Sequence, residues 1–270
     1  MGVAKLRPFK PIKPRLQAGD AVIGAWCVLP SAAVINVIAA AGMDFVIIDL
    51  EHGPMGFEIA EDMARAAVSE GCSPLARLGQ NDETAILKAL DLGAHGLLVA
   101  HVEQKQDAQD IVAFAKYYPW GLRGFSPYTR AGKYGAGQID QHCPRQNEET
   151  LVGVILEGKA GIENLEAVLE TEHLDLVYIG AYDLSQALGI PGQVNHPEIK
   201  RQMEKCIRKI RDAGLAAGGH VAKSAEDLAW MTDMGMQFIT VLPDVALLRQ
   251  ACEALVGDFQ SLPAKRNNPR

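Results

Sequence analysis

Short apolar runs and longer amphipathic stretches alternate along most of the chain. The apolar runs are rich in β-branched residues and have the length of buried strands, and they fall at 21–26, 45–49, 73–78, 96–100, 153–157, 176–180, 216–220 and 238–242. Stretches with helical periodicity lie between and after them, at 32–41, 57–70, 82–92, 104–117, 162–171, 197–213, 224–234 and 245–255. The pattern therefore predicts eight strand–helix units. Glycine follows five of the helical stretches where a helix should end, at Gly42, Gly71, Gly93, Gly214 and Gly235.

Eight such units in about 250 residues predict a closed (β/α)8 barrel, a TIM barrel. An open doubly wound sheet is disfavoured because no G-x-G-x-x-G follows the first strand. We expect residues 16–258 to form this single domain. Residues 1–15, which are basic and carry proline at every third position from Pro8 to Pro14, should form an extended arm, and residues 259–270 a polar tail. The connection 118–150 is long enough to be a functional or interface loop.

The composition excludes several classes of protein. The 270 residues are 48% hydrophobic with a net charge of −7, as in a soluble globular protein. The longest nearly apolar stretch, 32–43, is shorter than the ~20 residues of a membrane span, and no basic run in the body of the chain suggests nucleic-acid binding. The cysteines are odd in number and form no C-x-x-C, and no signal peptide opens the chain. We therefore expect a cytoplasmic protein.

Carboxylates are concentrated at the ends of the predicted strands, where a barrel of this kind holds its chemistry. Asp49 ends the second strand and is followed by Glu51 and His52. Glu157 ends the fifth strand, and Asp183 follows the sixth. Two anionic oxygen ligands with the other positions left to water and substrate suit a hard divalent cation, Mg²⁺ or Mn²⁺. Taken singly, Asp183 is equally well explained as a helix cap and Glu157 as a partner of Lys159.

Three further residues are candidates for catalysis. His52 taken alone could be a structural histidine, but its place beside two carboxylates favours a catalytic role. Arg77 closes an apolar strand, where a guanidinium needs a carboxylate or an anionic ligand such as a small oxoacid. Asp91 lies in the last turn of a predicted helix, where a negative charge is unfavourable unless it has a partner, and a histidine would serve.

At these residues the sequence resembles the metal-dependent class II pyruvate aldolases of the HpcH/HpaI aldolase and citrate lyase family. The resemblance runs from about residue 16 to residue 255. No single motif is specific, but their order and spacing together are. The motifs are Gly24-Ala25-Trp26, Asp49-Leu50-Glu51-His52, Ala76-Arg77, Leu90-Asp91-Leu92-Gly93-Ala94, Gly121-Leu122-Arg123-Gly124, Leu156-Glu157, Ile179-Gly180-Ala181-Tyr182-Asp183-Leu184-Ser185, Leu188-Gly189 and His196-Pro197.

The resemblance implies a role for each matching residue. Glu157 and Asp183 would bind Mg²⁺, Mn²⁺ or Co²⁺, and Asp49 would hold a metal-bound water. Arg77 would stabilise the enolate oxygen of pyruvate. His52, oriented by Asp91, would take the proton of the substrate's C4 hydroxyl. The substrate-binding residues would be Trp26, Arg77, Gly180, Tyr182, Asp183 and His220, with backbone amides near Gly180 receiving the carboxylate.

This chain departs from the family pattern near the expected aldehyde pocket. Ile155 stands where the family usually has Gln, Ala181-Tyr182 where it has Pro-Ala or Pro-Ser, and His220 where an apolar residue is usual. The eighth strand ends in Val241-Leu242-Pro243-Asp244 where the family has Val-Gly-x-Asp. Tyr182 and His220 suggest an aldehyde with polar or anionic groups, although a structural hydrogen bond between the two explains them equally well. Family members commonly form hexamers with exchanged C-terminal helices, so the resemblance also implies a homo-oligomer.

Three functions remain open. The first is a divalent-metal aldolase that reversibly cleaves a 4-hydroxy-2-oxoacid to pyruvate and an aldehyde. The second is a related carbon–carbon lyase acting on a CoA thioester or a dicarboxylic oxoacid, although no extra basic loop is present to hold a nucleotide diphosphate. The third is a barrel that binds an oxoacid without turning it over, which the departures at Ile155 and Tyr182 permit.

Overall fold

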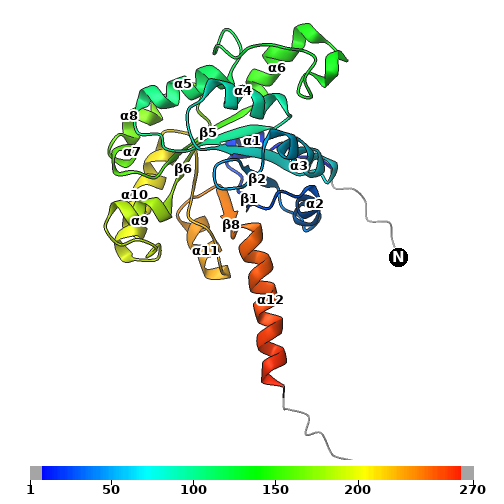
Figure 1. Ribbon diagram of the computed structural model, residues 1–270. Helices are drawn as coiled ribbons and strands as arrows, with labels where there is room; N and C mark the ends of the chain where they lie inside the picture. The colour runs from blue at the N-terminus through cyan, green and yellow to red at the C-terminus, as the bar shows by residue number, and fades with distance from the viewer. Residues whose placement is uncertain (1–7, 263–270) are drawn as a thin grey trace, which may run out of the picture.

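Eight parallel strands close into a barrel in the computed structural model, which describes residues 8–262 (Figure 1). Each strand pairs with its neighbours in sequence, and the last pairs with the first, where Val22 lies opposite Phe238. The predicted (β/α)8 barrel is thereby confirmed, and each strand boundary lies within two residues of its expected position. The strands are β1 (Val22–Cys27), β2 (Phe45–Asp49), β3 (Ser73–Leu78), β4 (Gly96–Val99), β5 (Leu151–Leu156), β6 (Leu176–Ile179), β7 (Ala216–Gly219) and β8 (Phe238–Val241).

Helices surround the barrel and bury their apolar faces against it (Figure 1). Several begin at capping side chains: Ser31 and Asp82 accept hydrogen bonds from the backbone amides of Val34 and Ala85. The five expected glycine stops all have positive φ, from 74° to 104°. The main helices are α2 (Ala32–Ala40), α3 (Phe57–Ser69), α4 (Glu83–Asp91), α5 (Lys105–Ala115), α10 (Pro197–Asp212), α11 (Ala225–Asp233) and α12 (Asp244–Ser261).

The structure corrects the prediction for the N-terminal arm. Residues 12–17 form helix α1 (Ile12–Gln17) instead of continuing an extended segment. Pro11 is the N-cap and Pro14 lies in the first turn, where a missing N–H costs nothing because it has no partner inside the helix. Ile12 and Leu16 are buried in the core of the barrel interior, and this packing stabilises the helix. The part of the predicted arm before Pro8 lies outside the described residues.

Three other segments differ in detail from the prediction. In place of the predicted helix 162–171 there are two short helices, α7 (Lys159–Glu163) and α8 (Leu165–Leu169). The long connection 118–150 contains helix α6 (His142–Glu149) and two single 3₁₀ turns (Lys133–Gly135 and Ile139–Gln141). The predicted tail from 259 begins inside α12, which continues to Ser261, and the rest of that tail beyond Leu262 is not described.

Two cores build the domain. One lies between the strands and the surrounding helices, and the other fills the barrel, where Phe45 and Phe238 stack with ring centroids 4.1 Å apart. Near the carboxyl ends of the strands, the rings of Trp26 and Tyr178 meet edge to face at 5.6 Å and form the upper layer of the barrel core. Within residues 8–262, no helix has the length and apolarity needed to cross a membrane.

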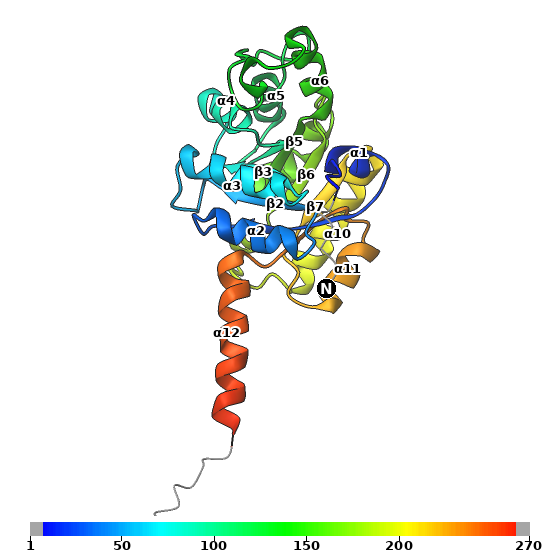
Figure 2. The ribbon, with the colours of Figure 1, turned by 90° about the vertical axis from the view of Figure 1, so that its right-hand side faces the viewer.

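Helix α12 projects away from the barrel (Figures 1 and 2). Asp244 anchors its first turn by accepting hydrogen bonds from the backbone amides of Val28 and Leu29 after β1, at 3.1 and 3.0 Å. No other residue of this helix is buried. Leu255 and Phe259 are 70% and 75% exposed, so the helix carries apolar surface that no described part of the chain covers.

Candidate active site

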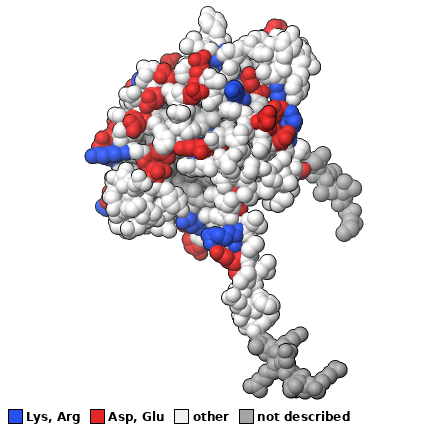
Figure 3. Space-filling model, in the orientation of Figure 1, with Lys and Arg blue, Asp and Glu red and all other residues white. Residues whose placement is uncertain are grey.

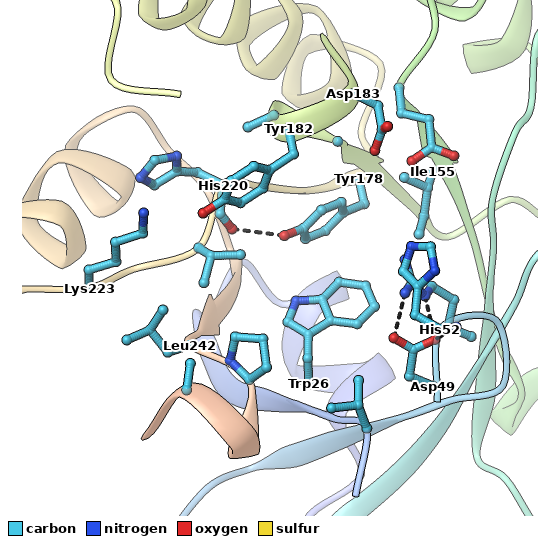
Figure 4. A pocket seen from close by; sticks show the side chains of 18 of the residues that line it. Trp26, Asp49, His52, Ile155, Tyr178, Tyr182, Asp183, His220, Lys223 and Leu242 are labelled. Atoms are coloured by element: carbon cyan, nitrogen blue, oxygen red, sulfur yellow. Dashed lines mark hydrogen bonds and ion pairs between the residues drawn. The ribbon is translucent and has the colours of Figure 1, made fainter. Parts of the chain in front are cut away.

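A cavity of about 550 Å³ opens at the carboxyl ends of the strands (Figure 4). It is lined by residues at or just after strand ends, including those of β1, β2, β3, β6 and β7, and by the start of α12. The fold therefore gathers side chains that are far apart in sequence. Nine of the ten predicted site residues line it: Trp26, Asp49, His52, Arg77, Glu157, Gly180, Tyr182, Asp183 and His220.

The predicted need of Arg77 for a carboxylate is met by Asp49, its partner in the register of β2 and β3. Arg77 donates through Nε to Oδ1 of Asp49 at 2.9 Å, and its Nη2 pairs with the other carboxylate oxygen. The guanidinium also lies 3.3 Å from Glu51 and 4.8 Å from the ring centroid of Trp26. Arg77 is thus held on several sides in a fixed orientation at the cavity wall.

His101, which the sequence analysis overlooked, joins two of the carboxylates. Its Nε2 lies 2.9 Å from Glu51 and its Nδ1 2.9 Å from Glu157, and its backbone amide donates to Glu157 at 3.1 Å. It lies two residues after the end of β4 and adopts φ 58°. Its position after a strand end, the signal that identified the other residues, would have identified His101 as well.

Glu157 and Asp183 lie near each other, as their predicted shared role requires. Burial raises the pKa of Glu157; His101 opposes this shift, while the charges of Asp183 and Glu51 add to it. Neither alternative explanation is found: Asp183 makes no capping hydrogen bond in α9 (Ala181–Ala187), and Lys159 is paired with Glu163 at 3.7 Å. Close oxygen donors of like charge are a donor set that a hard divalent cation would stabilise.

Gly180 allows the side chain of Glu157 to lie close to the backbone at the start of α9. A Cβ atom at position 180 would lie 2.6 Å from the Cβ of Glu157 and 3.1 Å from its Oε2. Only glycine leaves Glu157 in its place. Within residues 8–262, no group of three or more His, Cys, Asp or Glu side chains is arranged as an all-protein metal site. A cation held by Glu157 and Asp183 would therefore keep positions for water and substrate oxygens.

His52 and Asp91 are not brought together within this chain. The backbone amide of His52 donates to Asp49 at 3.0 Å, and its exposed imidazole lines the cavity with no hydrogen-bond partner among the described residues. Asp91 lies outside the cavity and accepts a hydrogen bond of 2.6 Å from the buried side chain of Arg123. The partner that Asp91 needs is therefore an arginine here, and the orientation of His52 by Asp91 stays a prediction.

Tyr182 and His220 line the opposite side of the cavity (Figure 4). No hydrogen bond joins them among the residues described, so the structural alternative for this pair is not found. The hydroxyls of Tyr178 and Thr240 each donate to the backbone carbonyl of His220 at 2.8 Å. Lys223 lies on the same side, and Arg249 of α12 also lines the cavity; the sequence analysis singled out neither. Neither directly follows a strand or belongs to a motif, so no sequence signal identified them.

Comparison with known proteins shows the family of this chain. The family model described as HpcH/HpaI aldolase/citrate lyase matches residues 22–251. The chain is 34% identical over 256 residues to a Salmonella gallinarum protein named 2-keto-3-deoxy-L-rhamnonate aldolase, covering 93% of this chain and 94% of the relative.

Two solved structures are similar over nearly their whole length. The HpcH/HpaI aldolase from Desulfitobacterium hafniense superposes with a TM-score of 0.89 at 28% identity, covering 96% of this chain and 99% of that chain. Citrate synthase SbnG superposes with a TM-score of 0.84 at 30% identity, covering 93% and 97%. The chain therefore belongs to the HpcH/HpaI aldolase/citrate lyase family and is a lyase of the pyruvate-aldolase type.

Proposed function

We propose that this chain is a divalent-metal-dependent aldolase that reversibly cleaves a 4-hydroxy-2-oxoacid to pyruvate and an aldehyde. The proposal rests on one cavity that is lined by Glu157, Asp183, the fixed guanidinium of Arg77 and the imidazole of His52. That imidazole has no hydrogen-bond partner in the described part of the chain. These are the groups that an aldol cleavage through a stabilised enolate needs. A barrel that only binds an oxoacid would not need a free imidazole beside them.

Glu157 and Asp183 would hold Mg²⁺, Mn²⁺ or Co²⁺ with open positions for the 2-oxo and carboxylate oxygens of the substrate. When bound, the ion supplies Lewis acidity that lowers the free energy of the enolate. Backbone amides at the start of α9 would receive the substrate carboxylate, because Gly180 leaves room beside Glu157. Asp49 keeps the Arg77 guanidinium in place, and we assign it the additional role of contacting a water on the ion.

His52 acts as the general base in this proposal. It removes the proton of the C4 hydroxyl, directly or through a water. The C3–C4 bond then breaks, its electron pair passes into the enolate of pyruvate, and the C4 carbon leaves as the aldehyde. Arg77 stabilises the negative charge that develops on the enolate oxygen, and protonation at C3 completes pyruvate.

The test is pyruvate release by protein stripped with EDTA, with and without Mg²⁺ or Mn²⁺. The substrates are a panel of 4-hydroxy-2-oxoacids that includes 2-keto-3-deoxy-L-rhamnonate, the compound in the name of the relative at 34% identity. We expect release that depends on the metal. Likeness to citrate synthase SbnG at 30% identity makes citrate formation the second reaction to assay. Release of pyruvate without metal, or no turnover in either assay, would contradict the proposal.

We also propose that the protein is a cytoplasmic homo-oligomer. The apolar surface of α12 has no partner among residues 8–262, and a second copy would cover it. No disulfide joins any of the five cysteines, which suits a reducing compartment. Sedimentation of the purified protein should give a mass that is a multiple of 29.1 kDa, whereas a stable monomer would contradict the oligomer.

A further inference from the structure

Four carboxylates lie close together where the strands of the barrel end. They belong to Asp49 at the end of β2, Glu51 just after it, Glu157 directly after β5 and Asp183 in the first turn of α9. Arg77 pairs with Asp49 and Glu51, and other basic side chains gather where α12 leaves the barrel (Figure 3). Among residues 8–262, no lysine or arginine forms an ion pair with Glu157, and the polar side chain that contacts its carboxylate is that of His101. His101 is therefore the residue that can fix the direction of this carboxylate.

The backbone on both sides of His101 is anchored to neighbouring strands. The amide of Ala100 donates to the carbonyl of Leu78 in β3 at 2.9 Å, and the amide of Val102 donates to the carbonyl of Ile155 in β5 at 3.4 Å. The side chains of Ala100 and Val102 are both buried. Residue 101 is therefore held between the ends of β3 and β5, and these anchors maintain its φ of 58°, which is costly for a residue other than glycine.

This backbone position places the His101 ring between two carboxylates. Its Nε2 lies 2.9 Å from Oε1 of Glu51, and its Nδ1 lies 2.9 Å from Oε1 of Glu157. The backbone amide of His101 donates to the same Oε1 of Glu157 at 3.1 Å. The other oxygen, Oε2, makes no hydrogen bond or ion pair within residues 8–262, and it faces Gly180, where a Cβ would approach it to 3.1 Å. One oxygen of Glu157 is thus occupied, and the other is open on the side of α9.

The second partner of the ring connects it to Arg77, to which the proposed function assigns the enolate. Glu51 contacts His101 through Oε1, and its Oε2 lies 3.3 Å from Nη1 of Arg77. Gly79 makes room for this side chain, since a Cβ there would lie 2.9 Å from Cγ of Glu51. Glu51 is therefore held at both oxygens and supports the His101 ring on the side away from Glu157.

We propose that His101 is a positioning residue for Glu157. Its ring and amide hold Oε1 of Glu157 and leave Oε2 for the divalent cation, and Glu51 keeps the ring in this orientation. The inference rests on the proposed aldolase function and deepens it by naming the group that presents the metal ligand. His101 is not among the residues that line the cavity, so it acts through Glu157 and contacts neither cation nor substrate. A carboxylate that binds through one oxygen leaves more positions on the cation for water and substrate.

Titration with Mn²⁺, followed by the electron paramagnetic resonance of the free ion, tests this role without turnover. His101→Asn removes the ring and places a residue that tolerates positive φ. Its affinity for Mn²⁺ should fall by about 10- to 100-fold. His173→Asn is the matched control, because His173 also has positive φ, at 62°, and stacks on Trp120 outside the cavity. Its affinity should stay within about twofold of the wild type, and an unchanged affinity in His101→Asn would overturn the positioning role.

Recovery by excess metal distinguishes positioning from other losses. If His101 acts by presenting Glu157, saturating Mn²⁺ should return kcat for cleavage in His101→Asn to within about fivefold of the wild type. Activity that stays lost although Mn²⁺ is bound would show that His101 acts on the chemistry itself and would overturn the proposal. Far-ultraviolet circular dichroism checks that each variant is folded.

A double-mutant cycle tests the support that Glu51 gives to the ring. Glu51→Ala should lower Mn²⁺ affinity in the wild-type background, and the same change should cost at least about threefold less in His101→Asn, where the ring is already absent. The cycle separates this support from the direct effect of the Glu51 charge, which is the same in both backgrounds. Losses that add fully would overturn the part of the proposal that concerns Glu51.

The metal titration and the pyruvate assay together separate this inference from the proposed function. Weakened Mn²⁺ binding in His101→Asn, with no pyruvate released by the wild type, would support the positioning role and contradict the aldolase. Metal-dependent pyruvate release by the wild type, with unchanged Mn²⁺ affinity in His101→Asn, would overturn the positioning role and leave the aldolase standing. A wild-type protein that binds no Mn²⁺ would overturn both.

Discussion

At the scale of single residues, the site combines groups held firmly with one that is free to react. Asp49 receives hydrogen bonds from Arg77 and from the backbone amides of Glu51 and His52. These hydrogen bonds fix the positions of the guanidinium and of the loop after β2. The imidazole of His52 has no partner among the described residues and faces the cavity, as a general base should before substrate binds.

His52→Ala tests the role of the base. Cleavage of the best 4-hydroxy-2-oxoacid should fall by about 10²- to 10⁴-fold in kcat, because the C4 hydroxyl loses its proton acceptor. Affinity for Mn²⁺ and for pyruvate should stay within about twofold, since neither contacts this ring in the proposal. Coupled detection of pyruvate and a Mn²⁺ titration give the two readouts. Unchanged turnover would remove His52 from the mechanism.

Glu157→Gln combined with Asp183→Asn tests the metal ligands. Neutral amides keep the shape of the carboxylates but lose their charge, so affinity for Mn²⁺ should fall by about 100-fold or more, and activity should be lost at ordinary metal concentrations. Without metal, the double variant should be at least as stable as the parent, because burial already disfavours the charged form of Glu157. Activity that remains sensitive to EDTA with unchanged affinity would contradict this assignment.

At the scale of elements, the site depends on how closely neighbouring strand ends approach. Glu157 directly follows β5 and Gly180 directly follows β6, and Leu156 and Ile179 are register partners in these two strands. The residue after Ile179 therefore lies against Glu157, and any side chain there would meet it. Helix α9 begins at this point, so Gly180 sets both the position of Glu157 and the place where α9 presents Asp183.

Gly180→Ala should displace the Glu157 carboxylate and lower Mn²⁺ affinity by about tenfold, while the barrel stays folded. The nearby change Gly158→Ala is a matched control, because its Cβ would meet only Glu103 Oε1, at 3.9 Å. Titration with Mn²⁺ and far-ultraviolet circular dichroism of both variants provide the comparison. Equal affinities in the two variants would show that the close approach at Gly180 has no part in placing the ligand.

At the scale of the whole molecule, the end of the barrel opposite the site is closed by α1 and by buried polar groups. Lys116 is fully buried and donates to the carbonyls of Asn147 and Thr150 at 2.6 and 2.7 Å. Lys13 from α1 donates to the same Thr150 carbonyl at 3.1 Å and pairs with Asp175 at 3.0 Å. The amine of Lys116 is therefore a structural donor far from the chemistry, and the mechanism does not use it as a Schiff base.

Lys116 should make stability depend on pH. Burial, with a contribution from the charge of Lys13, lowers its pKa from 10.5 to about 7. Above pH 7 the unfolded chain holds a proton at this amine that the folded protein has lost, so the free energy of unfolding rises with pH, by up to about 1.4 kcal/mol per unit. Below pH 7 both states are protonated at this amine, and above pH 10.5 both have lost the proton. In neither range does Lys116 make the free energy of unfolding depend on pH.

Urea unfolding of the wild type and of Lys116→Met between pH 7 and 8.5 measures this contribution. The difference in free energy of unfolding between the two proteins should change with pH in the direction just given. Lys159→Met, at a side chain that is 78% exposed, serves as the control and should give a difference that is flat across the same range. A flat difference for Lys116→Met as well would show that the buried amine keeps its ordinary pKa.

The sequence by itself determined the eight strand–helix units and most of the site. Alternation of apolar and amphipathic segments, capping residues and glycine stops are local signals. They were sufficient to predict the barrel. Parallel strands of a closed barrel all end at one face, so residue types at strand ends were enough to place Asp49, His52, Arg77 and Glu157 around one cavity. Family resemblance added roles, which local pattern alone does not contain.

Only the tertiary structure decided how these residues pair and what surrounds them. Barrel closure brings Glu51 and Glu157 to either side of His101, and it places Asp91 against Arg123, because contacts between distant segments depend on register and loop path. The sequence also gave no indication that Lys223 lies near Tyr182 or that residues 12–17 form a helix. Burial of Ile12 and Leu16 against the barrel, a contact that local pattern does not encode, stabilises that helix.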